Sequence, residues 1–233
     1  MQNKSILHIF FFVLSAALLV SCSEKTISPD NNRLGLEYFP LETGQFRVYD
    51  VDEILYSISS FDTLKYQLKE SVVSTFENAE DGITYTIHRE KRNTDQETWK
   101  LDSVWSARKT NSIAVSVENN ISFVKMVFPI KNDLRWDGNV LNSLAEKQYV
   151  YDMNLEKMTF SEQVFTDLVK VIQSDVEENI VNRDERYEIY AKEVGLVEKY
   201  GMSLMYCTVD CPSQKTIVSG RFIQQTLTSY GQD

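Results

Sequence analysis

Three cysteines offer the most reactive chemistry in this 233-residue sequence. Cys22 directly follows an uncharged, largely apolar run over 6–20, whereas Cys207 and Cys211 lie near the end of the chain in a C-x₃-C spacing. A thiol can form a disulfide, bind a metal or accept an acyl group, and its surroundings decide among these reactions. The segments around each cysteine therefore have to be considered with it.

The segment that ends at Cys22 predicts an exported, lipid-anchored protein. It begins with the positive Lys4, and its 15-residue apolar run is about 22 Å long as a helix, which is short for a membrane span and typical of a signal peptide. Its last four residues, Leu19-Val20-Ser21-Cys22, resemble a bacterial lipobox. We therefore expect 1–21 to be a lipoprotein signal peptide and Cys22 to carry fatty-acid chains such as palmitate. The alternatives are an ordinary cleaved signal or an uncleaved anchor.

A polar segment follows Cys22, and we expect 22–34 to be a flexible tether that precedes a β-rich globular domain over 35–233. The segment has no acidic run of the kind that directs some lipoproteins to the cell surface. The sequence therefore favours the periplasmic face of the outer membrane, with surface display as the alternative.

The charge balance excludes some classes of partner. The chain from Cys22 onward has 212 residues with 23 bases and 34 acids, a net charge of −11. Phosphate backbones and anionic lipid headgroups repel such a domain. We therefore expect no nucleic-acid binding, and membrane attachment only through the acyl chains on Cys22.

The remaining side chains predict no catalytic residue, metal site or cofactor. His88 is the one histidine after the leader, so sites that need two histidines are excluded. The sequence also lacks a glycine-rich phosphate loop, a calcium loop and a nucleophile elbow. The acids in 50–53 and 175–178 could supply the paired carboxylates of a hydrolase, although acids near turns are more often solvated.

Cys207 and Cys211 are expected to form a structural disulfide across a hairpin loop. Export favours oxidation, and the C-x₃-C spacing differs from the C-x₂-C of redox sites and zinc knuckles. Two free thiols are the alternative.

Alternation of apolar and polar residues with a period of two begins near residue 45 and predicts ten or eleven strands. No sustained helical pattern separates these strands, so we expect an all-β fold with minor helix: a single domain built on a curved antiparallel sheet, either a half-barrel or a barrel. Asn119-Asn120 predicts a tight hairpin turn, and 141–147 could form one or two helical turns. The expected strands are 45–57, 64–76, 83–88, 99–104, 113–118, 121–128, 147–160, 162–174, 186–192, 196–207 and 216–229.

Four short phrases stand out along the domain: Tyr38-Phe39-Pro40-Leu41, Phe128-Pro129-Ile130, Trp136-Asp137-Gly138-Asn139, and Tyr190-Ala191-Lys192-Glu193-Val194-Gly195-Leu196-Val197. They resemble phrases of uncharacterised outer-membrane or periplasmic lipoproteins of Bacteroidetes-type bacteria, which have a β-rich half-barrel distantly similar to lipoprotein carriers such as LolA. Phe46 departs from that pattern, which has Trp there. The resemblance implies a curved sheet that cradles an apolar group, and it brings no catalytic residues.

The aromatic residues are the remaining candidates for a ligand face. Trp99, Trp105 and Trp136 could line such a face, and core packing is the alternative. The sequence thus favours a non-catalytic binding or chaperone-like module for a lipid, peptide or glycan. A structural or accessory subunit of an envelope protein complex is the second hypothesis, and a carboxylate-based hydrolase is the third.

Replacing the acceptor thiol tests the lipid anchor. We expect Cys22→Ser to abolish incorporation of a fatty-acid analogue, because the serine hydroxyl cannot replace the thiol. In-gel detection of the label measures this, with Cys207→Ser as the control that keeps its label. Undiminished labelling of Cys22→Ser would contradict the prediction.

Overall fold

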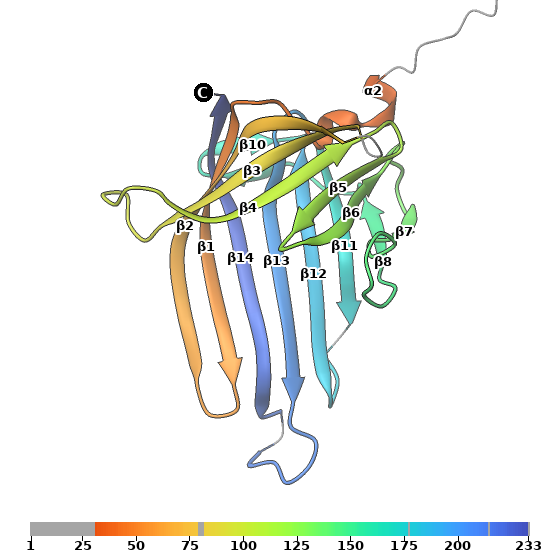
Figure 1. The fold of residues 1–233 in the computed structure, drawn as a ribbon. Helices are drawn as coiled ribbons and strands as arrows, with labels where there is room; N and C mark the ends of the chain where they lie inside the picture. The colour runs from red at the N-terminus through yellow and green to blue at the C-terminus, as the bar shows by residue number, and fades with distance from the viewer. Residues whose placement is uncertain (1–30, 79–81, 177, 214, 233) are drawn as a thin grey trace, which may run out of the picture. The chain divides into compact units, whose positions relative to one another are not determined.

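The alternating segments pair in antiparallel order and build one twelve-stranded sheet, with a separate two-stranded hairpin (Figure 1). The computed structural model describes residues 31–78, 82–176, 178–213 and 215–232. The strands are β1 (Gln45–Ser57), β2 (Phe61–Asn78), β3 (Gly82–Arg92), β4 (Lys100–Lys109), β5 (Ile113–Glu118), β6 (Ile121–Val127), β7 (Arg135–Asp137), β8 (Gln148–Asp152), β9 (Met158–Phe160), β10 (Gln163–Phe165), β11 (Leu168–Val176), β12 (Asn182–Ala191), β13 (Gly195–Tyr206) and β14 (Ile217–Gln232). Two short helices, α2 (Asn31–Leu34) and η1 (Leu36–Tyr38), precede them.

The sheet curls until its two edge strands meet, so that it is a nearly closed barrel at one end. The strand order is β6-β5-β4-β3-β2-β1-β14-β13-β12-β11-β8-β7. The amide of Val124 in β6 donates to the carbonyl of Gly138 just after β7 over 2.9 Å. Gly138 has to be a glycine for this approach, because a Cβ there would lie 2.4 Å from the Tyr149 ring.

Side chains complete this seam between β6 and the 136–151 segment. The indole Nε1 of Trp136 donates to the Val124 carbonyl over 2.9 Å. The Tyr151 hydroxyl accepts from the Val127 amide over 2.9 Å and donates to its carbonyl over 3.0 Å. Asn142 donates to the carbonyl of Ser122. Polar backbone groups that an edge strand would leave unpaired are therefore satisfied along β6.

The segment before β1 caps the closed end of the barrel. The Lys109 ammonium donates to the carbonyls of Leu36 and Phe39 over 2.8 and 2.7 Å. The Glu193 amide donates to the carbonyl of Glu37. Because these bonds join the cap to β4 and to the β12–β13 turn, both halves of the sheet hold it in place.

The opposite end of the sheet is open. Strands β1, β2 and β11–β14 extend well beyond the shorter strands (Figure 1). Strand β2 pairs with β3 only from Gln67 onward, and β11 pairs with β8 only over three residues, from Lys170 to Ile172. The long strands therefore continue beyond the closed end as a curved sheet that is open on one side.

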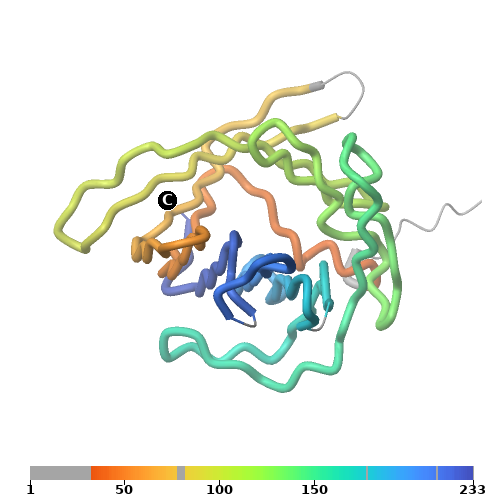
Figure 2. The backbone as a smooth tube through the Cα atoms, turned by 90° about the horizontal axis from the view of Figure 1, so that it is seen from below, coloured from red at the N-terminus to blue at the C-terminus, as the bar shows by residue number. Residues whose placement is uncertain are grey.

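The β9–β10 hairpin covers part of the outer surface. The 153–167 segment runs along the outside of the C-terminal strands (Figure 2). Phe160 and Phe165 belong to a buried cluster that includes Leu168, Ile189 and Val197. A second buried cluster, which includes Trp136, Tyr149 and Tyr151, packs behind the seam.

These observations confirm an all-β, single-domain, antiparallel fold. The predicted Asn119-Asn120 turn is also present, since both residues have positive φ values of 51° and 65°. The structure has fourteen strands rather than ten or eleven: 147–160 contains both β8 and β9, 162–174 contains both β10 and β11, and β7 was not expected. Segment 141–147 forms turns rather than helix, because its polar groups bond into the seam.

The leader and most of the predicted tether lie outside the described residues. The last four residues of the range 22–34 form α2, and the Leu34 carbonyl accepts from the Ile130 amide over 3.1 Å. Cys207 and Cys211 form the expected disulfide. Among the described residues, no helix has the length and apolar character that a membrane crossing requires.

The seam predicts a specific stability effect. Tyr151→Phe keeps the ring but leaves both Val127 backbone groups without their hydroxyl partner, so we expect it to lower the free energy of unfolding by about 1–3 kcal/mol. Urea denaturation measures this loss. Tyr149→Phe is the matched control, since the Tyr149 hydroxyl makes no hydrogen bond to a described residue. Equal losses in the two variants would contradict the role of the hydroxyl.

Candidate functional site

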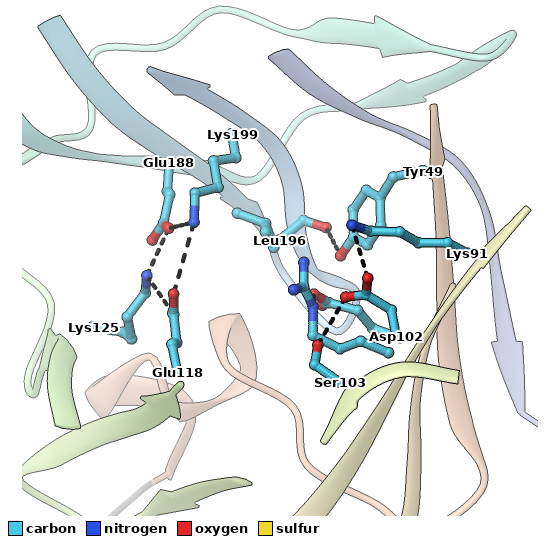
Figure 3. Close-up of polar contacts among 11 residues, drawn as sticks. Tyr49, Lys91, Asp102, Ser103, Glu118, Lys125, Glu188, Leu196 and Lys199 are labelled. Atoms are coloured by element: carbon cyan, nitrogen blue, oxygen red, sulfur yellow. Dashed lines mark hydrogen bonds and ion pairs between the residues drawn. The ribbon is translucent and has the colours of Figure 1, made fainter. Parts of the chain in front are cut away.

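A cluster of four charged side chains crosses the interior of the barrel (Figure 3). The Lys125 Nζ lies 2.6 Å from a Glu188 oxygen and 3.1 Å from a Glu118 oxygen. The Lys199 Nζ lies 3.5 Å from Glu188 and 3.9 Å from Glu118. We call these four residues the ion cluster. It joins two parts of the sheet that are far apart in strand order.

Strand register and the turn between β5 and β6 bring the cluster together. Glu188 and Lys199 lie directly opposite each other in the β12–β13 pair. Glu118 ends β5 immediately before the Asn119-Asn120 turn, and Lys125 follows in β6. Because closure of the barrel brings β6 across to β12, the two pairs meet in the interior.

Three members of the cluster, Glu118, Lys125 and Glu188, are buried, and their pKa values are shifted towards the ionised form. Burial alone would raise the pKa of Glu188, but Lys125 and Lys199 outweigh burial and lower it. The same balance lowers the pKa of Glu118. Burial alone would lower the pKa of Lys125, but the two carboxylates raise it. A carboxylate with a lowered pKa is a poor proton donor at neutral pH, so this pair lacks the protonated acid that a two-carboxylate hydrolase requires.

A small cavity, partly open to solvent, lies on the capped side of the ion cluster. Its volume is about 60 Å³, and its lining runs from Phe39, Pro40 and Leu41 in the cap to the ion cluster. A space of this size holds a few water molecules and is smaller than the roughly 300 Å³ of a typical ligand pocket. The cavity is therefore part of the closed end rather than a site for a large ligand.

The polar side chains around this cavity are only partly paired. Arg89 lies 2.9 Å from Glu70, and its guanidinium carbon lies 3.6 Å above the centre of the Trp105 ring. The Arg47 Nη1 donates to the Val194 carbonyl over 3.1 Å. The Arg47 Nε, the Trp105 Nε1 and the Gln225 Nε2 are buried without a hydrogen-bond partner among the described residues.

A larger cleft lies on the other side of the ion cluster, towards the open end of the sheet. Its volume is about 350 Å³, within the usual range for ligand sites. Four bases, Lys125, Arg186, Lys199 and Arg221, and one acid, Glu118, line it. The aromatic rings of Phe123 and Tyr149 also belong to its lining. This cationic cleft is the best candidate for a binding site, and it differs from the apolar surface that the resemblance implies.

The three tryptophans do not form a common ligand face. Trp136 is buried in the seam. Trp105 lines the small cavity. Trp99 lies at the β3–β4 loop, with the Arg92 guanidinium carbon 4.3 Å above its ring. None of the three lines the cleft, and Cys22 lies outside the described residues. No group of three or more His, Cys, Asp or Glu residues that could hold a metal ion occurs in the described parts of the chain.

Sequence reasoning missed every residue of the ion cluster and the cleft. A weak signal was present: Lys125 and Glu188 are charged residues within otherwise apolar strand segments, Phe123-Val124-Lys125-Met126-Val127 and Tyr187-Glu188-Ile189-Tyr190. A charged residue on the inward side of a strand indicates a buried pair, but its partner cannot be identified without the fold.

Comparison with known proteins finds only distant structural likenesses. No family model matches the sequence, and no curated protein matches it either. A solved structure from Bacteroides fragilis NCTC 9343, inferred to be an exported protein and described with a YmcC-like fold, is 12% identical over 83% of this chain and 98% of its own, with a TM-score of 0.42. A protein from Parabacteroides distasonis ATCC 8503, inferred to be a lipoprotein, is 12% identical over 83% and 98%, with a TM-score of 0.36. At these TM-scores neither supports an argument about function, and the likeness to LolA stays a prediction.

The ion cluster predicts a pH-dependent stability. Glu188→Gln leaves the buried Lys125 without its closest partner, so we expect a loss of about 3 kcal/mol at pH 7. Because the folded protein lowers the pKa of Glu188 below the ordinary 4.5, its contribution is present above pH 4.5 and fades as the pH falls further. The difference between wild type and variant should therefore shrink in acid, as urea denaturation at pH 7, 5 and 3 measures.

The control for this prediction is Glu185→Gln, on the same strand. Glu185 pairs with Arg183, and both side chains are about one-third exposed, at 36% and 33%, so its loss should be below about 1 kcal/mol. A difference between wild type and Glu188→Gln that stays constant from pH 7 to pH 3 would contradict the assignment.

Proposed function

We propose that this protein is a lipid-anchored, non-catalytic binding module of the cell envelope, and that the cationic cleft binds its ligand. The observation that carries the proposal is the cleft itself: a hollow of about 350 Å³ on the concave side of a sheet that is nearly closed and capped at its other end. Fixed strands position its side chains, which is typical of a preformed binding site.

The predicted anchor would attach to the domain at the end away from the cleft. The described chain begins at α2, beside the closed end (Figure 1). The cleft lies on the side of the ion cluster that faces away from the cap. The nine residues from Cys22 to Asp30 span at most about 30 Å. With acyl chains on Cys22, the tether would thus join the domain at its capped end rather than at the cleft.

The lining of the cleft favours a polar ligand among the three classes that the sequence left open. An acyl chain requires an extended apolar surface, whereas five charged residues line this cleft. The cavity on the capped side, at about 60 Å³, is too small to receive an acyl chain instead. These contrasts support a glycan or a peptide over a lipid.

One observation favours the second candidate function, an accessory subunit of an envelope complex. The β1–β2, β11–β12 and β13–β14 connections lie together at the open end (Figure 1). Each presents an exposed aliphatic side chain: Ile58 is 72% exposed, Ile180 is 82% exposed and Val209 is 76% exposed. Exposed apolar groups that gather on one end are typical of protein contacts.

Native mass spectrometry of the full chain with Cys22→Ser, purified from the periplasm, tests these functions. We expect a small molecule that stays bound in the gas phase and is released on denaturation. Finding no small molecule, together with one stoichiometric protein, would replace the first function by the second. In that case Ile58→Ser combined with Val209→Ser should release the protein, whereas Ile83→Ser, an exposed position on β3, should not.

A further inference from the structure

A buried amide without a partner lies in the wall of the cationic cleft. Gln173 is only 8% exposed, and it sits in β11 at a bulge between Ile172 and Ser174. A bulge changes the direction of a side chain. The Gln173 Nε2 makes no hydrogen bond to a described residue, although Gln173 lines the cleft. Because a buried donor without a partner is destabilising, its placement indicates an acceptor that binds there.

Two guanidinium groups in the cleft use only some of their N–H donors for contacts within the protein. The Arg186 Nε and Nη2 contact the two oxygens of Asp184 over 2.7 and 2.8 Å. The Arg221 Nε contacts Glu53 over 2.7 Å. The Arg186 Nη1 and both terminal nitrogens of Arg221 make no hydrogen bond to any residue that the structure describes. The carboxylates thus fix the two groups and leave N–H donors for a planar oxyanion.

Lys199 is the ion-cluster member best placed to bind a ligand. Its Nζ lies 3.5 and 3.9 Å from its carboxylate partners, whereas the Lys125 Nζ lies 2.6 and 3.1 Å from the same two groups. The Lys199 side chain is also 27% exposed against 8% for Lys125. Lys125 is therefore the tighter partner of both carboxylates, and Lys199 is the looser one and the one more exposed to the cleft.

The four bases that line the cleft are each in contact with a carboxylate, from Glu118, Glu188, Asp184 or Glu53. An anion would therefore be bound by the N–H groups that these carboxylates leave unpaired, rather than by a net positive charge.

We propose that the cleft binds a saccharide that carries a carboxylate or another oxyanion. This inference rests on the proposed function and adds the ligand class. Arg186, Arg221, Lys199 and Gln173 would hold the anion, and Phe123 would contact the apolar face of the sugar ring. A peptide is less suitable, because the β12–β14 backbone at the floor of the cleft is already paired and leaves no edge to which a peptide strand could bond.

Titration calorimetry with the full chain carrying Cys22→Ser tests the ligand class. The probes are trigalacturonic acid, the neutral maltotriose and the acidic peptide triglutamate. We expect trigalacturonic acid to bind at least tenfold more tightly than maltotriose, and its affinity to fall as sodium chloride is raised. Equal binding of the two sugars would overturn the proposal, and so would tighter binding of triglutamate.

Matched variants locate the site. Arg186→Gln and Arg221→Gln should each weaken trigalacturonic acid binding at least tenfold. Arg183→Gln should leave it unchanged, because Arg183 lies on the same strand but pairs with Glu185 and is not in the cleft. Equal losses for Arg183→Gln and Arg186→Gln would overturn the assignment, and urea midpoints within error of wild type would show that each variant folds.

The two experiments distinguish an error in the ligand class from an error in the binding function. If no anionic saccharide binds but native mass spectrometry finds another small molecule, the ligand class is wrong and the binding function stands. If neither experiment finds a small ligand, both proposals are wrong.

Discussion

The seam between β6 and the 136–151 segment is the contact on which the rest of the molecule depends. An open sheet of twelve strands would leave the outer edge of β6 unpaired and its inner side chains exposed. Backbone and side-chain bonds to Val124 and Val127 bring β6 across the barrel instead. That closure carries Lys125 to Glu188 and so forms the ion cluster. The cluster in turn separates a small cavity under the cap from a larger cleft. The position of the candidate site therefore follows from the way the sheet closes.

The ion cluster explains how the barrel tolerates charge in its interior. A single buried charge is strongly destabilising, whereas two acids and two bases in mutual contact offset much of that cost. The pKa of each carboxylate is lowered for this reason, and the pKa of Lys125 is raised. Apolar residues could fill the same volume with equal or better stability. The cluster is therefore better explained by what it presents to the cleft, a base with spare hydrogen-bonding capacity, than by stability alone.

The four phrases that resemble those of envelope lipoproteins lie at the closed end of the barrel. Tyr38-Phe39-Pro40-Leu41 forms the cap, and Trp136-Asp137-Gly138-Asn139 belongs to the seam. Gly195, in the last phrase, has a φ of +89°, and a Cβ there would lie 2.8 Å from the Arg47 guanidinium that bonds to Val194. The phrases thus describe how the barrel is closed and capped. None of them contributes the charged residues of the cleft, so the resemblance relates to the fold and leaves the ligand open.

The sequence by itself determined the all-β class, the antiparallel order, most strand positions and the Asn119-Asn120 turn. These features depend on alternation and turn chemistry, which are local. It also determined the disulfide, because four residues of separation bring two thiols together almost regardless of the fold. Only the tertiary structure decided that β7 pairs with β8, that 141–147 bonds across the seam, and that Trp99, Trp105 and Trp136 lie apart. It alone placed Lys125 beside Glu188, because residues 63 positions apart in the chain meet only when the curvature of the whole sheet closes the barrel.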